Sequence, residues 1–150
     1  MAHTFTNLLT HIIFSTKDRM PMLDAHLKER LLPYIGGIFR ELGATPLLIN
    51  GPTDHRHVLT VLPARIAVSE ILNKVKTNSS RWVHKEFPNQ RTFAWQTGYA
   101  AFSVSSSQKE AVLEYIANQE EHHRKISFKE EFVSFLKKHE IEHHEKYLWE

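Results

Sequence analysis

Cysteine is absent from the sequence, and glycine and proline are scarce. The 150 residues include 5 Gly and 6 Pro. Without cysteine the chain cannot form disulfides, thiolate nucleophiles, iron–sulfur clusters or cysteine-based zinc sites. The low glycine and proline content excludes a collagen-like chain and is not typical of disordered proteins. Histidine, carboxylate and amide side chains therefore remain as the ligands for any metal ion.

The sequence also lacks long apolar runs and a strong net charge. Its first 17 residues have no positively charged n-region and only short apolar runs, so we expect neither a signal peptide nor a membrane span. We therefore expect a cytoplasmic protein. With 19 Lys and Arg against 17 Asp and Glu, the formal net charge is +2, so any nucleic-acid-binding surface must be a local patch.

The composition is that of one ordinary globular domain. Hydrophobic residues make up 41% of the sequence and charged residues 24%. A chain of this length buries roughly 70% of its unfolded surface on folding, which is enough for one core without crosslinks. The sequence has neither an internal repeat nor a visible domain boundary, and we predict one domain over residues 1–150.

Six predicted elements follow one another in the order strand, helix, strand, strand, helix, strand. Asp24 is the expected N-cap of the first helix, and Pro33 is expected to kink that helix. The predicted ranges are a strand over 4–14, a helix over 25–42, strands over 45–50 and 55–62, a helix over 69–87 and a strand over 93–104. This order is typical of an α+β, ferredoxin-like βαββαβ fold with an antiparallel four-stranded sheet. The first and third strands should be central, and both helices should cover one face.

Two additional helices are predicted after this unit. Ser107–Glu110 and Ser127–Glu130 each match the capping-box pattern. The first box precedes a helix over about 111–124, and the second precedes a helix that includes Phe132 and Leu136. These C-terminal helices could cover the second face of the sheet.

His55 and His57 form the first candidate site. They lie two residues apart on a predicted strand, so both side chains point to the same face and can reach one ion. An isolated pair of this kind is most often only a pair of polar residues on a half-exposed strand. A second group of residues strengthens the metal-binding interpretation.

Tyr115 and Gln119 form that second group. They lie four residues apart on a predicted helix and share one face, with His122 a further turn along. A tyrosine on such a face is by itself only a rim residue. A side-chain amide oxygen near a histidine pair, however, completes a mixed nitrogen and oxygen site for a hard cation. Together these residues suggest Mg²⁺ or Mn²⁺ beside a tyrosine.

Several segments match the pattern of one known family. They are Asp54–His57, Trp95–Ser105 and Tyr115–His123, with further similarity at His11–Lys17 and Tyr147–Trp149. In these segments the chain resembles the HUH single-strand DNA transposases with one catalytic tyrosine, the small insertion-sequence transposases related to REP-associated tyrosine transposases. The resemblance implies that His55, His57 and Gln119 bind the metal and that Tyr115, on an added C-terminal helix, is the nucleophile.

The same resemblance implies metal-dependent cleavage and rejoining of single-stranded DNA at insertion-sequence ends. Tyr115 would attack the scissile phosphate to give a 5′-phosphotyrosine and a free 3′-OH, with Mg²⁺ or Mn²⁺ polarising the phosphate. The DNA is expected to carry hairpins near the element ends. We also expect a homodimer in which Tyr115 of one subunit serves His55 and His57 of the other. We expect the protein to be bacterial or archaeal and to be associated with the nucleoid.

Basic residues offer a candidate path for the DNA backbone. Those predicted to contact phosphates are Lys17, Arg19, Lys74, Lys76 and Arg81. A solvated surface position is an equally good interpretation for each of them taken singly.

Arg56 departs from the family pattern, in which a hydrophobic residue separates the two histidines. Alternation along the strand points its side chain to the face that the helices cover. Because an unpaired guanidinium is costly in an apolar layer, we predict an ion pair with a carboxylate, with Asp54, Glu70 and Glu86 as candidates.

Two other functions fit parts of the sequence. One is a catalytically silent nucleic-acid-binding protein whose open sheet works as an RRM-like platform, which would not require the two histidines, the tyrosine and the glutamine together. The other is a metal-binding or metal-hydrolase domain that uses the C-terminal histidines. His139–His143 matches the H-E-x-x-H pattern of zinc proteases, but only seven residues follow it, too few for the rest of such a site.

Overall fold

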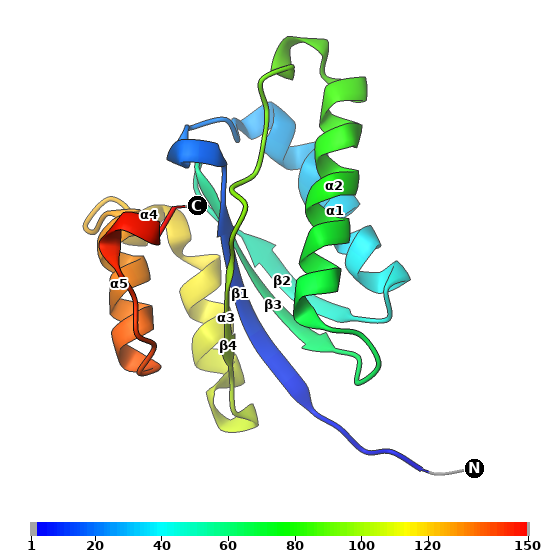
Figure 1. The fold of residues 1–150 in the computed structure, drawn as a ribbon, viewed down its shortest axis with the longest axis vertical. Helices are drawn as coiled ribbons and strands as arrows, with labels where there is room; N and C mark the ends of the chain where they lie inside the picture. The colour runs from blue at the N-terminus through cyan, green and yellow to red at the C-terminus, as the bar shows by residue number, and fades with distance from the viewer. Residues whose placement is uncertain (1–2, 150) are drawn as a thin grey trace.

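The computed structural model describes residues 3–149, which form a four-stranded antiparallel sheet with helices on both faces (Figure 1). The strands are β1 (Leu8–Ser15), β2 (Thr45–Asn50), β3 (His55–Leu62) and β4 (Ala100–Ser103), and their order across the sheet is β2-β3-β1-β4. The predicted α+β class, the antiparallel sheet and the two central strands are therefore confirmed.

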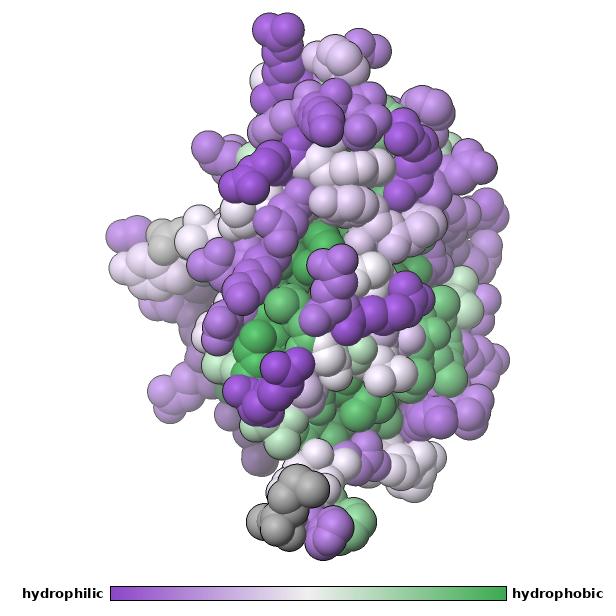
Figure 2. All heavy atoms as spheres, turned by 90° about the vertical axis from the view of Figure 1, so that its right-hand side faces the viewer, coloured by the Kyte–Doolittle hydropathy of each residue, from purple (hydrophilic) through white to green (hydrophobic). Residues whose placement is uncertain are grey.

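Helices α1 (Ala25–Glu41) and α2 (Val68–Glu86) cover one face of the sheet. Alternation along β1 and β3 points Ile12, Phe14 and Val58 into this face, where they pack against the apolar side of both helices. The Asp24 side chain accepts a 2.8 Å hydrogen bond from the backbone N–H of Leu27 and caps α1 as predicted. Figure 2 shows this side of the molecule, on which polar and charged side chains surround apolar ones.

Helices α3 (Lys109–Ala117), α4 (Gln119–His122) and α5 (Phe128–Lys138) belong to the second face. Phe132 of α5 packs with Ile13 and Phe102, and Ile116 of α3 packs with Leu9 and Leu59. The second face is therefore covered, unlike the open sheet that an RRM-like platform requires. In the part of the chain that the structure describes, no helix is long and apolar enough to cross a membrane.

The capping box at Ser127 is formed, but the one at Ser107 is not. Ser127 Oγ accepts from the Glu130 backbone N–H at 3.2 Å, and it also hydrogen-bonds the Glu130 side chain at 3.0 Å. Ser107 instead pairs with the hydroxyl of Ser105 at 2.9 Å, in a short 3-10 turn that precedes α3. The prediction of an N-cap at Ser107 was wrong because this turn places the Ser107 hydroxyl against Ser105 and not against a backbone N–H of α3.

The helix predicted over 111–124 is interrupted at Asn118. The side-chain amide of Asn50, at the end of β2, donates to the carbonyl of Ile116 at 2.9 Å and lies 3.4 Å from that of Ala117. These are carbonyls that a continuous helix would bond to its next turn. A contact from a distant strand therefore ends α3, and the chain resumes as the short α4.

The strand predicted over 93–104 pairs regularly only at Ala100–Ser103. Before it, the Gln96 side chain enters the ladder, where its Oε1 accepts from the backbone N–H of Ser15 at 2.6 Å. The Lys76 ammonium of α2 holds the carbonyls of Gln96, Thr97 and Gly98. Backbone pairing before Ala100 is limited to an isolated bridge at Trp95, with hydrogen bonds from Gln96 to Ser15 and from Lys17 to Ala94, so the prediction was too long at its start.

Arg56 lies on the predicted face but without the predicted ion pair. Its side chain is fully buried, and Nη1 donates to the carbonyls of Pro52 at 2.7 Å and His55 at 2.9 Å. Nε and Nη2 have no hydrogen-bond partner among the described residues. Burial lowers the pKa of Arg56 to about 10, with the charge of Asp54 opposing this shift, so the guanidinium stays charged near neutral pH. The prediction was wrong because backbone carbonyls of the preceding turn take the place of a carboxylate.

This arrangement predicts different outcomes for two substitutions of Arg56. Arg56→Ala removes both carbonyl contacts and leaves a void, and should lower the free energy of unfolding by about 3 kcal/mol. Arg56→Met keeps most of the volume and removes the two partnerless donors, so it should stay within about 1 kcal/mol of the native protein. Urea unfolding measures both values. A methionine variant as unstable as the alanine variant would show that the carbonyl contacts, and not packing, hold this turn.

Candidate metal centre and nucleophile

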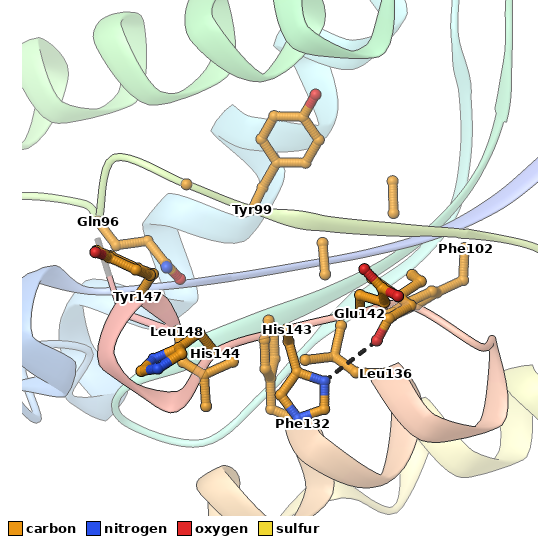
Figure 3. Close-up of a pocket in the computed structure, with 14 residues that line it drawn as sticks. Gln96, Tyr99, Phe102, Phe132, Leu136, Glu142, His143, His144, Tyr147 and Leu148 are labelled. Atoms are coloured by element: carbon orange, nitrogen blue, oxygen red, sulfur yellow. Dashed lines mark hydrogen bonds between the residues drawn. The ribbon is translucent and has the colours of Figure 1, made fainter.

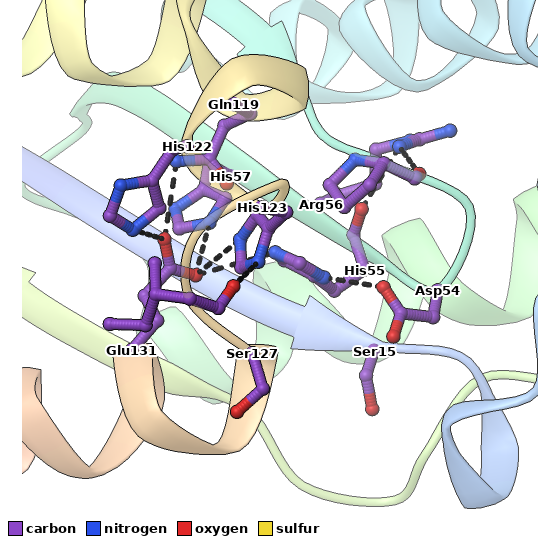
Figure 4. A network of polar contacts seen from close by, with 12 residues as sticks. Ser15, Asp54, His55, Arg56, His57, Gln119, His122, His123, Ser127 and Glu131 are labelled. Atoms are coloured by element: carbon purple, nitrogen blue, oxygen red, sulfur yellow. Dashed lines mark hydrogen bonds and ion pairs between the residues drawn. The ribbon is translucent and has the colours of Figure 1, made fainter.

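The side chains that could hold a metal ion come from one strand, one helix and the segment after α4, on the second face of the sheet (Figure 4). His55 and His57 project from β3, His123 follows α4, and Glu131 lies on α5. One ligand atom from each of these four residues falls within 4.8 Å of the others. The predicted convergence of the two strand histidines is present, and the structure adds a third histidine and a carboxylate.

Glu131 lies at the middle of this group. Its Oε1 is 3.0 Å from His57 Nε2, 3.2 Å from His123 Nε2 and 3.4 Å from His55 Nε2. Burial acts to raise the pKa of this carboxyl, but the surrounding histidines outweigh burial and hold the pKa well below its usual range. The carboxylate is therefore ionised and presents negative charge to the point where the three rings meet.

Each of the three rings is oriented from its other nitrogen. His55 Nδ1 bonds to Asp54 Oδ1 at 2.7 Å, and His123 Nδ1 bonds to the carbonyl of Ile126 at 3.0 Å. His57 Nδ1 shares a 2.8 Å hydrogen bond with the ring of His11. Burial is the main cause that lowers the pKa of His57 to about 4 and that of His11 to about 3, so both rings are neutral at physiological pH. Neutral rings held in this way are suited to binding a metal through Nε2.

Tyr115 lies against the same carboxylate. Its hydroxyl donates to Glu131 Oε2 and is 3.1 Å from His122 Nε2. Burial, reinforced by the neighbouring Glu131 charge, raises the pKa of Tyr115 well above its usual value. The phenol is therefore protonated in this arrangement, and its proton is directed at Glu131.

Gln119 completes the site one turn after Tyr115. The residue is fully buried, and its Nε2 lies 3.5 Å from the Tyr115 carbonyl and 3.3 Å from Glu131 Oε2. Its Oε1 has no hydrogen-bond partner among the described residues. The structure thus brings all four predicted site residues, His55, His57, Tyr115 and Gln119, into one place.

Three buried acceptor or ligand atoms in this site lack hydrogen bonds. They are His55 Nε2, His123 Nε2 and Gln119 Oε1. Buried polar atoms are rarely left without a partner unless an ion, water or substrate satisfies them. The three imidazoles and the carboxylate can hold a divalent metal ion, and the orphaned atoms fit that role.

A hollow of about 310 Å³ gives access to the tyrosine. Its wall includes Tyr115, His122, Glu131 and His11, and Lys138 lies at its edge. Lys138 is exposed, so its ammonium can meet an incoming phosphate. The Tyr115 side chain is thus reachable from solvent on one side and backed by the histidine cluster on the other.

The predicted DNA-contacting residues are spread over two regions. Lys17 and Arg19 are exposed in the 3-10 turn after β1, where the Arg19 guanidinium lies 4.3 Å from the Trp149 ring centroid. Lys74 and Arg81 are exposed on α2, across the sheet from the metal-binding group. The Lys76 ammonium donates hydrogen bonds to three backbone carbonyls. A role in phosphate binding stays a prediction for all five.

The histidines of the H-E-x-x-H match do not converge. The His139 ring stacks on Phe102 at 4.4 Å, whereas His143 lies in a separate hollow of about 440 Å³ beside β4 (Figure 3). His143 Nδ1 bonds to the carbonyl of Ile141 at 3.2 Å. Within residues 3–149 the only group able to hold a metal is the one around Glu131.

Sequence reasoning missed His123, Glu131 and the orienting residues His11 and Asp54. One signal for Glu131 was available, because it lies at helical spacing among Phe128, Phe132 and other apolar residues of a capped helix. An acidic residue on the buried side of an amphipathic helix requires a partner. His123 had no comparable signal, since its direction depends on the break after α3.

Known proteins share this sequence pattern and fold. The model of the family described as "Transposase IS200 like" matches residues 4–119. A proposed transposase from Deinococcus radiodurans R1 is 22% identical with a TM-score of 0.65, covering 79% of this chain and 95% of that one. A REP-associated tyrosine transposase bound to a REP hairpin is 14% identical with a TM-score of 0.61, covering 84% of this chain and 74% of that one. No curated protein matches at a significant level. Because the family match spans more than half of the chain, the protein belongs to the IS200-like transposase family.

Proposed function

We propose that the protein cleaves and rejoins single-stranded DNA at insertion-sequence ends through a covalent bond between Tyr115 and a 5′ phosphate. The observation that carries this proposal is the position of the Tyr115 hydroxyl. In a chain of the transposase family, that hydroxyl lies in a solvent-reachable hollow against a buried group of three histidines and a carboxylate.

Tyr115 and Glu131 supply the groups for the attack. The tyrosine oxygen forms the new bond to phosphorus, and the bond from phosphorus to the 3′ oxygen breaks. The hydroxyl already donates to Glu131 Oε2, so this carboxylate orients the oxygen for attack, and the proton passes to solvent through the hollow as the bond to phosphorus forms. The leaving 3′ oxygen takes a proton from solvent and becomes a 3′-OH.

His55, His57 and Gln119 would hold a divalent ion, Mg²⁺ or Mn²⁺, beside the tyrosine. Such an ion polarises the scissile phosphate and stabilises the charge that develops on it. The three residues come from β3 and α4 and are fully buried, so their positions are fixed by the core. Because the phosphotyrosine bond keeps the energy of the original ester, the reverse attack by a 3′-OH can rejoin strands without ATP.

The DNA would enter through the hollow that contains Lys138. We propose Lys17, Arg19, Lys74 and Arg81 as further phosphate contacts, since all four are exposed. The substrate we propose is a single strand with a hairpin near the cleavage point, the kind of DNA found with one of the similar structures.

The first prediction of this proposal concerns the nucleophile. Tyr115→Phe removes only the attacking oxygen, so the covalent protein–DNA product should disappear while DNA binding stays nearly unchanged. Denaturing electrophoresis with a labelled single strand and Mn²⁺ measures the product. Tyr147→Phe is the matched control, because Tyr147 is exposed and far along the chain, and it should form the product normally. A covalent product in the Tyr115 variant would contradict the assignment.

The second prediction concerns the metal. His57→Ala removes one ligand and should reduce cleavage and also the rise in melting temperature that added Mn²⁺ produces in the native protein. A chelator should abolish cleavage by the native protein, and Mn²⁺ should restore it. The control His143→Ala changes an exposed tail histidine and should behave like the native protein. Undiminished cleavage by the His57 variant would place the site elsewhere.

The third prediction concerns assembly. The predicted homodimer with shared sites can be tested by mixing Tyr115→Phe chains with His57→Ala chains. Shared sites, as expected from the sequence, predict that cleavage recovers after mixing, whereas a site built within one chain, with Tyr115 beside its own histidines, predicts no recovery. Recovery, with subunit exchange confirmed by a tagged chain, would show that the tyrosine helix serves the partner subunit.

A further inference from the structure

We propose that this chain binds its metal with four protein ligands, His55, His57, His123 and Glu131, and that the site prefers transition-metal ions to Mg²⁺. The inference rests on the proposed function, because it concerns the same site, and it revises the ligand set: His123 and Glu131 bind the ion directly in place of Gln119. His123 and Glu131 lie beyond residue 119, where the family match ends. The segment after the matched region would thus complete the metal centre.

The distances from the Glu131 carboxylate to the three histidine nitrogens are compatible with direct coordination. A tetrahedral ion with bonds of about 2.0–2.1 Å places its ligand atoms about 3.3–3.4 Å apart, and octahedral neighbours lie closer. The three distances from Glu131 Oε1 to the histidine Nε2 atoms are 3.0, 3.2 and 3.4 Å. Two of the three, to His55 and His123, do not form hydrogen bonds despite these separations. Only His57 Nε2 forms a hydrogen bond with Glu131 Oε1, so two of the three imidazole nitrogens that converge on this oxygen are left for another partner.

His123 is oriented like the two strand histidines. Metal-binding histidines usually donate their other ring N–H to a carboxylate, a carbonyl or another acceptor. His55 has Asp54, His57 has His11, and His123 has the carbonyl of Ile126. This shared feature separates His123 from the adjacent His122, whose Nε2 faces the tyrosine hydroxyl. His123 therefore meets the Oε1 atom on which His55 and His57 converge, whereas His122 lies 3.2 Å from Oε2, the oxygen that contacts the tyrosine.

Glu131 is held by the packing of α5. Phe128, one turn earlier, stacks on the His55 ring with 3.7 Å between centroids and 3° between planes. Phe132 and Leu136 anchor the same helix in the core, and Ser127 caps it. Glu131 Oε1 faces the histidines while Oε2 contacts Tyr115. One carboxylate would therefore bind the metal and position the nucleophile.

The donor set decides which ions bind well. Three imidazoles and one carboxylate suit Zn²⁺, Co²⁺ and Mn²⁺, whereas Mg²⁺ prefers oxygen ligands and keeps its waters. The general order of stability places Mn²⁺ below Co²⁺ and Zn²⁺. We therefore expect the affinity to fall in the order Zn²⁺, Mn²⁺, Mg²⁺.

Isothermal titration of the full, chelator-treated chain with each of these ions tests the proposal. The native protein should bind one Zn²⁺ or Mn²⁺ per chain and Mg²⁺ far more weakly. Glu131→Gln and His123→Gln should each weaken Zn²⁺ and Mn²⁺ binding by about 100-fold or more, because loss of an outer partner alone costs 10- to 100-fold. Co²⁺ should give the strong visible absorption of a low-coordinate ion in the native protein and lose it in both variants.

Matched controls separate ligand loss from general damage. Glu130→Gln removes the same charge one residue away, keeps the capping box and should bind metal normally. His143→Gln replaces an exposed histidine outside the ligand group and should also bind metal normally. Circular dichroism of the metal-free variants checks folding, and two independent ligand variants keep the test decisive if one does not fold.

The outcomes distinguish this inference from the proposed function. Normal metal affinity in both ligand variants, or Mg²⁺ affinity equal to that for Mn²⁺, would overturn the four-ligand site while leaving cleavage by Tyr115 untouched. Metal binding that depends on Glu131 and His123, with no covalent DNA product in the native protein, would support the site and overturn the proposed function.

Discussion

The contact between the Glu131 carboxylate and the histidine rings is the constraint on which the site depends. A buried carboxylate is costly unless positive or hydrogen-bonding groups surround it. Here His55, His57 and His123 meet one oxygen, and the Tyr115 hydroxyl meets the other. This arrangement requires α5 to lie on the sheet and α4 to turn back over it. The packing of the C-terminal helices on the sheet and the arrangement of the site therefore depend on the same contacts.

Successive side chains of the central strand β3 point alternately to the main core and to the candidate site. Its residues facing α1 and α2 include Val58 and Leu62, which join the main core, whereas His55 and His57 face the other side. Arg56 is the exception on the core side, where backbone carbonyls of the turn before β3 accept its hydrogen bonds. Because that turn also carries Asp54, which orients His55, and because Arg56 donates to the His55 carbonyl, Arg56 stabilises the start of β3 while its side chain lies on the opposite face from the histidine rings.

Much of this architecture could be predicted from sequence, because its signals are local. The bounds of β2 and β3, the cap at Asp24 and the pairing of Tyr115 with Gln119 follow from periodicity and short spacings. The failures involve distant contacts: Asn50 ends α3, and backbone pairing before β4 is limited to an isolated bridge at Trp95. His123 and Glu131 were missed for the same reason, since their convergence requires the tertiary packing of two helices on the sheet.

The most direct test of this account is a crystal structure of the native chain with Mn²⁺, with anomalous diffraction recorded to locate the ion. The account predicts one anomalous peak within bonding distance of His55, His57, His123 and Glu131, with the Tyr115 hydroxyl adjacent to it. A peak held by His55 and His57 alone, with Glu131 turned away and Tyr115 outside the site, would contradict it.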